Sequence, residues 1–293
     1  MPKTFLEKVK EKTVIFDGAM GTLIMAAGVE SIKSPMLLNL EKPELVRDIH
    51  KQYFAAGADV ALTNTFSGNP LKLAAEGIDA KMDVLNREAA TLAKQACPEG
   101  KFVAGDIGPS GKTLPPIGDS SPEEMQEAFY LQAKVLIECG VDLLLIETMY
   151  SLEEAVAAVR GARKAGDILL VASMTYNHTE MGYYTIMGET VGQCASTLEE
   201  AGADMIGANC TLGSSEMIEL TQELRASTDK LILIQPNAGK PVTNGDRTYY
   251  EQTPAEFAKD LKKIKEAGAD MVGGCCGTTP EFIQAMAAAI SSN

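Results

Sequence analysis

Eight short apolar segments punctuate this 293-residue chain, and each is followed by turn residues and then by a helical pattern. The spacing leaves room for one strand and one helix in every unit, which predicts parallel strands joined by helices. Eight such units predict an α/β fold of the (β/α)8 TIM barrel type, built by a single domain over residues 1–293. The segments are residues 14–17, 60–65, 102–106, 143–147, 169–175, 205–210, 231–236 and 271–276.

A related tetrapeptide ending in Asp precedes the second, fourth, sixth and eighth segments. Each tetrapeptide places Gly where a helix would end and the chain would enter a strand. Generic loop chemistry is favoured over shared ancestry as the origin of this repetition, and both explanations support the strand assignment. The tetrapeptides are residues 56–59, 139–142, 201–204 and 267–270.

The net charge of the chain limits the classes of partner that it can bind. The formal net charge is −14, from 40 acidic and 26 basic residues. Nucleic acids and anionic membranes require a basic surface, so a small-molecule substrate is expected instead. Residues 1–13 are charged, and no apolar stretch has the length of a signal peptide or of a membrane span. These features predict a cytoplasmic protein whose six cysteines are thiols rather than a disulfide framework.

Three of those cysteines end apolar segments: Cys210 ends the sixth, and Cys275 and Cys276 end the eighth. Neighbouring side chains of a strand point to opposite faces, so the adjacent pair can hold one ion only where the backbone leaves β geometry, which the preceding glycines permit. Three convergent thiols predict a catalytic zinc site with one open position. The alternative is a buried Cys210 and an incidental pair. The remaining Cys97, Cys139 and Cys194 lie in or beside helical patterns and are interpreted as core thiols.

Polar groups at the same strand ends suit an amino-acid ligand. The turn from Asp17 through Gly18, Ala19 and Met20 offers backbone N–H groups to a carboxylate, and Asp17 and Glu147 could hold an ammonium group. Each acid could equally be a loop or helix-cap partner. His178 is a candidate fourth metal ligand or base, although a solvated loop histidine is the favoured interpretation.

Taken in order, seven motifs resemble the homocysteine S-methyltransferase family over nearly the whole chain. Its fold is a zinc-bearing (β/α)8 barrel, and the resemblance implies that Cys210, Cys275 and Cys276 are its catalytic zinc ligands. It also adds Asn237 to the substrate-binding residues. Within the family, residues 105–109 and 236–241 are most similar to the homocysteine-binding module of cobalamin-dependent methionine synthase. The motifs are residues 17–22, 63–66, 105–109, 147–148, 209–210, 236–241 and 273–278.

The resemblance implies a zinc-dependent methyltransferase of class EC 2.1.1 that activates the homocysteine thiolate in methionine biosynthesis. Because the chain stops at Asn293, the expected donor is methylcobalamin on a separate corrinoid protein. An excised module, or a small donor such as betaine or S-methylmethionine, is the alternative. Two other interpretations stay open: a phosphate-handling barrel that uses the turn 273–279, and a non-catalytic zinc- or thiol-binding subunit.

Overall fold

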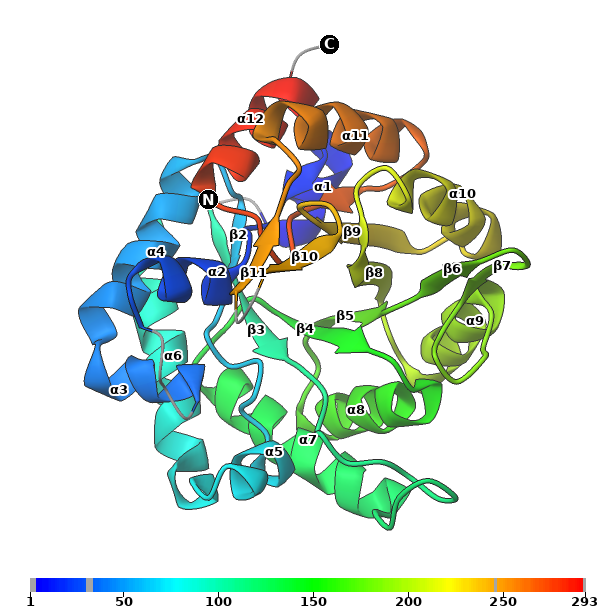
Figure 1. Ribbon diagram of the computed structural model, residues 1–293. Coiled ribbons are helices and arrows are strands. Elements are labelled where there is room, and N and C mark those ends of the chain that lie inside the picture. The colour runs from blue at the N-terminus through cyan, green and yellow to red at the C-terminus, as the bar shows by residue number, and fades with distance from the viewer. Residues whose placement is uncertain (1–3, 30–33, 245–246, 292–293) are drawn as a thin grey trace.

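The computed structural model describes residues 4–29, 34–244 and 247–291. All eight apolar segments form strands of one parallel sheet, in the order β1-β12-β9-β8-β5-β4-β3-β2 (Figure 1). A parallel bridge between Phe16 and Val60 joins the first strand to the second and closes the ring. The predicted (β/α)8 barrel is thereby confirmed. The strands are β1 (Val14–Ile15), β2 (Val60–Leu62), β3 (Phe102–Ile107), β4 (Leu143–Met149), β5 (Leu169–Met174), β8 (Met205–Gly213), β9 (Leu231–Asn237) and β12 (Met271–Val272).

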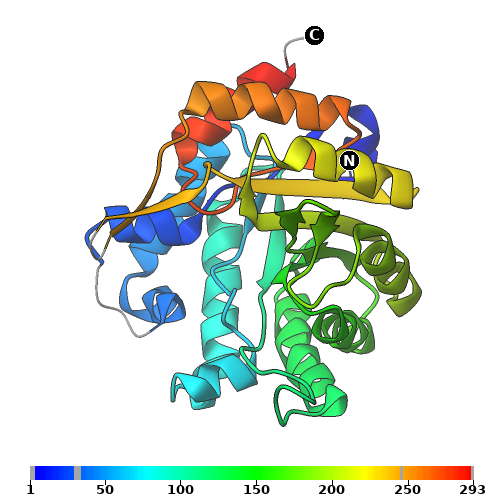
Figure 2. The same cartoon turned by 45° about the vertical axis from the view of Figure 1, so that its right-hand side comes forward.

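Helices surround the strands on the outside; in Figure 2, α10 to α12 cover the strands of the last units. The helical patterns expected after the apolar segments include α4 and α7. Thr or Ser caps several of them, and Pro occupies the first turn of α4, α5, α7, α11 and α12. None of the helices described has the length and apolar character needed to cross a membrane. The helices are α1 (Phe5–Glu11), α2 (Met20–Ala26), η1 (Pro35–Leu37), α3 (Leu38–Glu41), α4 (Pro43–Ala55), α5 (Pro70–Ala75), η2 (Asp79–Lys81), α6 (Met82–Ala96), α7 (Pro122–Glu138), α8 (Leu152–Ala165), α9 (Val191–Ala201), α10 (Met217–Ser227), α11 (Pro254–Glu266) and α12 (Pro280–Ser291).

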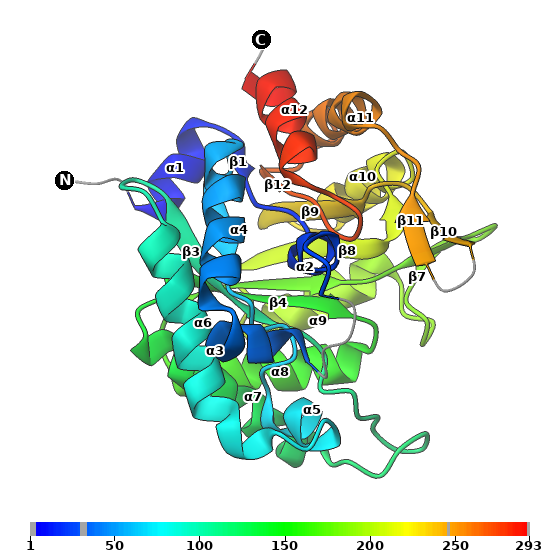
Figure 3. The ribbon, with the colours of Figure 1, turned by 60° about the vertical axis from the view of Figure 1, so that its left-hand side comes forward.

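Two antiparallel hairpins project from the end of the barrel at which the strands finish (Figure 3). One is β6 (Asn177–Thr179) with β7 (Gly182–Tyr184), and the other is β10 (Pro241–Asn244) with β11 (Arg247–Tyr250). The opposite end is closed by α1, whose Phe5 and Val9 join the apolar cluster inside the barrel. The rings of Phe5 and Phe102 meet edge to face, with centroids 5.4 Å apart.

The four tetrapeptides that end in Asp share one structural task. Each contains a glycine with positive φ, and each aspartate accepts a hydrogen bond from a backbone N–H of the strand before it. The four bonds therefore join the eight barrel strands in four neighbouring pairs at the N-terminal end of the barrel. Residues at that end of the fold usually contribute to stability rather than to chemistry. The pairs are Asp59 with Ile15, Asp142 with Val103, Asp204 with Leu170, and Asp270 with Ile232.

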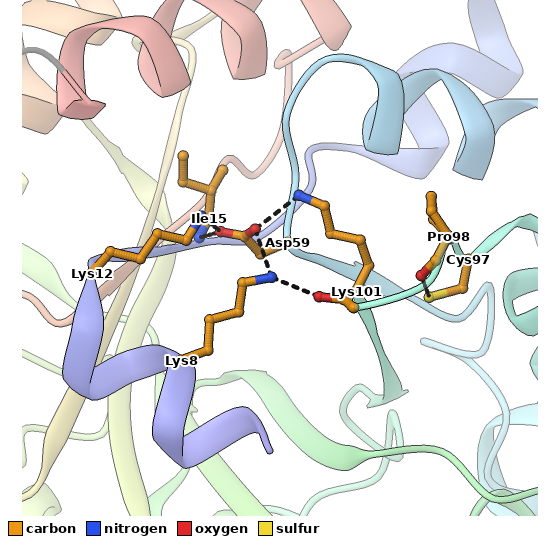
Figure 4. A network of polar contacts seen from close by, with 8 residues as sticks. Lys8, Lys12, Ile15, Asp59, Cys97, Pro98 and Lys101 are labelled. Carbon is orange, nitrogen blue, oxygen red and sulfur yellow. Dashed lines mark hydrogen bonds and ion pairs between the residues drawn. The ribbon is translucent and has the colours of Figure 1, made fainter. Parts of the chain in front are cut away.

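Asp59 is the most heavily buttressed of the four (Figure 4). Its side chain is fully buried, and the ammonium groups of Lys8, Lys12 and Lys101 lie 3.1, 2.6 and 2.8 Å from its oxygens. Burial alone would raise the pKa of Asp59, but hydrogen bonds from Lys101 and Lys12 lower it to about 2. The stabilisation is therefore complete above the ordinary carboxyl pKa and is lost only as the pH falls towards 2.

His50 in α4 is fully buried, and neither ring nitrogen has a hydrogen-bond partner among the described residues. Burial lowers the pKa of its imidazole to about 4. The unfolded chain then binds more protons than the folded protein between about pH 4 and the ordinary histidine pKa of about 6.5. Stability therefore falls as the pH drops through that window.

We expect His50 to destabilise the protein by ~2 kcal/mol on going from pH 7 to pH 5. The measurement is urea unfolding at both pH values for the wild type, His50→Leu, and the exposed control His178→Asn. The difference between wild type and His50→Leu isolates the imidazole, because every other group titrates in both proteins. Equal pH dependence of wild type and His50→Leu would contradict the assignment.

Candidate active site

A cavity of about 270 Å³ opens at the C-terminal end of the barrel. Residues at or just after the ends of β1, β2, β3, β4, β8, β9 and β12 line it, as expected for the active-site end of this fold. Three thiols and three carboxyl groups face it together. The cavity is lined in part by Asp17, Gly18, Ala19, Met20, Asp106, Glu147, Gln235, Cys210, Cys275 and Cys276.

The sulfur atoms of Cys210, Cys275 and Cys276 all lie within 4.8 Å of one another, and those of Cys210 and Cys276 are 3.9 Å apart. A tetrahedral zinc ion with Zn–S bonds of about 2.3 Å would place its sulfurs about 3.8 Å apart. Hydrogen bonds from Cys210 and Cys275 lower the pKa of Cys276 to about 3, so the cluster already favours a thiolate. The donor set therefore fits zinc with one position left for another ligand.

The backbone leaves regular β geometry in a different way after β12 and on β8, and these two changes bring the thiols together. The strand β12 ends at Val272, before the cysteine pair, instead of reaching Cys276 as predicted. A Cβ at Gly274 would lie 2.4 Å from Thr278 Oγ1, and one at Gly273 would lie 2.8 Å from Phe16 Cβ. These glycines are thus required for close approach. On β8, the register shifts after Asn209, and Cys210 takes a left-handed conformation with φ of 61°.

Thr278 ties the cysteine turn to the first loop. Its hydroxyl donates to the Cys275 carbonyl at 2.7 Å and accepts from the Ala19 N–H at 3.2 Å. The Tyr53 hydroxyl adds a bond to the Ala19 carbonyl at 3.0 Å. Thr279 and Pro280 follow, and Pro280 begins α12. The first and last loops of the barrel therefore hold each other in place.

The carboxyl groups of Asp17, Asp106 and Glu147 are buried around one end of the cavity. Burial, together with their mutual proximity, raises the pKa of Asp17 and of Asp106. Burial and the neighbouring Cys210 raise the pKa of Glu147 to about 7. Such a group of acids is stable as a set of anions only beside a cation, which makes this end suited to an ammonium group.

Several acceptor atoms at this end have no hydrogen-bond partner in the described part of the chain. They are Asp17 Oδ1, Asp106 Oδ1 and Gln235 Oε1, and all three residues line the cavity. A ligand with several N–H donors would satisfy them. Asp106 and Gln235 were not assigned to the site from the sequence. Their signal was a polar residue at the end of a buried segment, which is weak when taken alone.

The remaining predicted residues divide into those at the cavity and those away from it. The Ala19 N–H is already taken by Thr278. Met20 begins α2, so its N–H has no partner within that helix, and the residue lines the cavity. Asn237 is buried at the end of β9, and its side-chain oxygen has no partner among the described residues.

His178 does not join the thiols. It is exposed on β6 and stacks on Tyr183 with ring centroids 4.7 Å apart, so the solvated interpretation describes it and the metal-ligand one does not. Cys194 lies within α9, while Cys97 and Cys139 follow the last residues of α6 and α7, as predicted. The phosphate-handling alternative loses its basis, because acids and thiols surround the turn 273–279.

The chain is similar to known proteins over nearly its whole length. The homocysteine S-methyltransferase family model matches residues 14–290. Proteins named methionine synthase from Mycobacterium tuberculosis and Mycobacterium leprae are each 33% identical over 98% of this chain. The chain spans 25% of the length of each of these relatives.

Among solved structures, the homocysteine methyltransferase MmuM from Escherichia coli shares the fold. Its metallated form matches with a TM-score of 0.79 at 24% identity, covering 97% of this chain and 98% of that chain. Its apo form matches with a TM-score of 0.76 at 26% identity, covering 98% of each chain.

We expect one zinc ion per chain, and we expect Cys275→Ala to lose stoichiometric zinc because only two thiols remain to hold it. The measurement is elemental analysis after dialysis against a weak chelator. Cys97→Ala, which removes a thiol outside the cavity, is the matched control and should keep its metal. Full zinc retention by Cys275→Ala would contradict the three-thiol site.

Proposed function

Because this chain belongs to the homocysteine S-methyltransferase family, we propose that it transfers a methyl group to the sulfur of homocysteine and forms methionine. The observation that carries the proposal is the presence of two complementary sites in one cavity. Three thiols suit zinc, and three buried acids beside them suit an ammonium group. An amino acid that ends in a thiol would engage both.

Cys210, Cys275 and Cys276 would hold the zinc. When bound, zinc lowers the pKa of a coordinated thiol, so that the sulfur is available as a nucleophile near neutral pH. The three thiolates are electron-rich ligands that keep such a sulfur reactive. The chain therefore needs no separate general base positioned at the sulfur during the methyl transfer itself.

The rest of the cavity orients the amino acid. Glu147, Asp17 and Asp106 surround the position proposed for the ammonium group, and burial together with neighbouring acidic groups raises their carboxyl pKa values. The Met20 N–H at the start of α2 is available to the substrate carboxylate. With both charged groups fixed, the sulfur is left pointing at the thiol cluster, and this restriction lowers the entropic cost of reaction.

Glu147→Gln should weaken homocysteine binding on the order of tenfold or more, because a charge-assisted hydrogen bond in a buried site contributes roughly 1.5–3 kcal/mol. Zinc content should be unchanged. Calorimetric titration of the zinc-loaded proteins measures both the affinity and the number of sites. The exposed neighbour Glu153 supplies the matched control Glu153→Gln. Wild-type affinity in Glu147→Gln would show that Glu147 only fastens its loop.

For the methyl donor, we propose methylcobalamin carried by a separate corrinoid protein. Support comes from the methionine synthase relatives and from large apolar side chains exposed in segments that follow the barrel strands, of which Phe66 lines the cavity. Exposed apolar side chains of this kind suit transient contact with a protein surface. The exposed residues in these segments are Met25, Phe66, Ile117, Met181, Ile186, Met187 and Tyr249.

A donor screen tests this proposal. Zinc-loaded protein receives homocysteine with methylcobalamin (free or protein-bound), betaine, S-methylmethionine or methyltetrahydrofolate, and methionine is quantified. We expect turnover with methylcobalamin, and Cys275→Ala gives the background rate. Turnover with betaine or S-methylmethionine but not methylcobalamin would replace the donor. Binding of zinc and homocysteine without turnover on any donor would favour a non-catalytic thiol-binding subunit.

A further inference from the structure

Asn209 connects the acids of the cavity with its thiols. It is fully buried on β8, directly before Cys210. Its side-chain nitrogen donates to Glu147 Oε2 at 2.8 Å and lies 3.9 Å from Cys275 Sγ. One amide group thus contacts both the acid assigned to the ammonium group and a thiol of the proposed zinc site.

The orientation of this amide is fixed by its neighbours. Asn209 Oδ1 accepts from the Thr148 N–H at 2.8 Å and from the Ser173 hydroxyl at 2.8 Å. Since a backbone N–H can only donate, it requires the oxygen on this side and the nitrogen on the side of Glu147. The Asn209 carbonyl is also held, by the Thr175 hydroxyl at 2.6 Å.

The contact with Thr148 explains how Asn209 controls Glu147. The register of β4 shifts between Ile146 and Met149, and Thr148 has a φ of 57°. This irregularity turns the Thr148 N–H towards Asn209, whose amide nitrogen also donates to Thr148 Oγ1 at 2.7 Å. Asn209 therefore holds the residue after Glu147 by two bonds and Glu147 itself by a third.

We propose that Asn209 is a positioning residue that sets the separation between the ammonium-binding carboxylate and the thiol cluster, and so selects an amino thiol of homocysteine length. The inference rests on the proposed function. Cysteine has one methylene fewer between its amine and its sulfur, so it should match this fixed separation less well than homocysteine does. Asn209 acts through Glu147 and need not contact the substrate.

The test is a double-mutant cycle with two ligands. The wild type, Asn209→Ser, Glu147→Gln and the double variant are loaded with zinc, their metal content is measured, and each is titrated by calorimetry. The ligands are homocysteine and 4-mercaptobutanoate, which has the same thiol, chain and carboxylate but no amine. Cysteine is titrated with the wild type and with Asn209→Ser.

We expect Asn209→Ser to keep its zinc, to lose on the order of tenfold in homocysteine affinity and to bind 4-mercaptobutanoate as the wild type does. The preference for homocysteine over cysteine should shrink. In the Glu147→Gln background, Asn209→Ser should have no further effect on homocysteine. Equal losses for both ligands, or additive effects of the two substitutions, would overturn the inference.

Other outcomes are also decisive. A wild type that binds neither thiol would overturn the proposed function, and this inference with it. If Asn209→Ser does not fold, Ser173→Ala removes one bond to the Asn209 oxygen and leaves its nitrogen contacts intact. It should weaken homocysteine by about threefold while sparing 4-mercaptobutanoate. Equal weakening of the two ligands by Ser173→Ala would again argue for a merely structural role.

Discussion

The convergence of three thiols on one point is the constraint around which the C-terminal end of the barrel is built. Cys210 belongs to β8 and the cysteine pair follows β12, with β9 between these strands. Regular strands cannot place them together. The structure therefore accepts a left-handed Cys210 and a turn packed so tightly that Gly273 and Gly274 tolerate no side chain. A non-glycine residue in that conformation costs of order 1–3 kcal/mol, which the surrounding bonds must offset.

The N-terminal end of the barrel differs from the cavity end in how its polar groups are paired. There, backbone groups and carboxylates are paired, and Asp59 is surrounded by three ammonium groups. At the cavity, Asp17, Asp106 and Gln235 keep acceptor atoms without partners in the described chain. Unsatisfied buried groups destabilise a fold, and a ligand that satisfies them is bound more tightly as a result. The polar groups at the N-terminal end of the barrel thus have partners within the protein, whereas several at the cavity would be satisfied by a bound ligand.

The sequence predicted the parts of this arrangement that depend on local pattern. Apolar segments followed by turn residues identified all eight strands, and the cysteines at the ends of two of them indicated where three thiols meet. Contacts that depend on which strands are neighbours could not be predicted from the sequence. The role of Asn209 depends on hydrogen bonds from Ser173 on β5 and Thr148 on β4. The raised pKa of Asp106 depends on burial and on the nearby Glu147. The left-handed Cys210 and Thr148 carry no signal, since neither residue is a glycine.

The bond between Thr278 and Ala19 joins residues 259 positions apart in the chain. Because the chain is synthesised from its N-terminus, the first loop emerges long before the residues that hold it in place. Contacts of such long sequence separation form slowly and late. Cys210 is also exposed to the surroundings before Cys275 and Cys276 exist. The cavity therefore cannot assemble until residues 275–278 have been made, and no ion could be held by all three thiols before then.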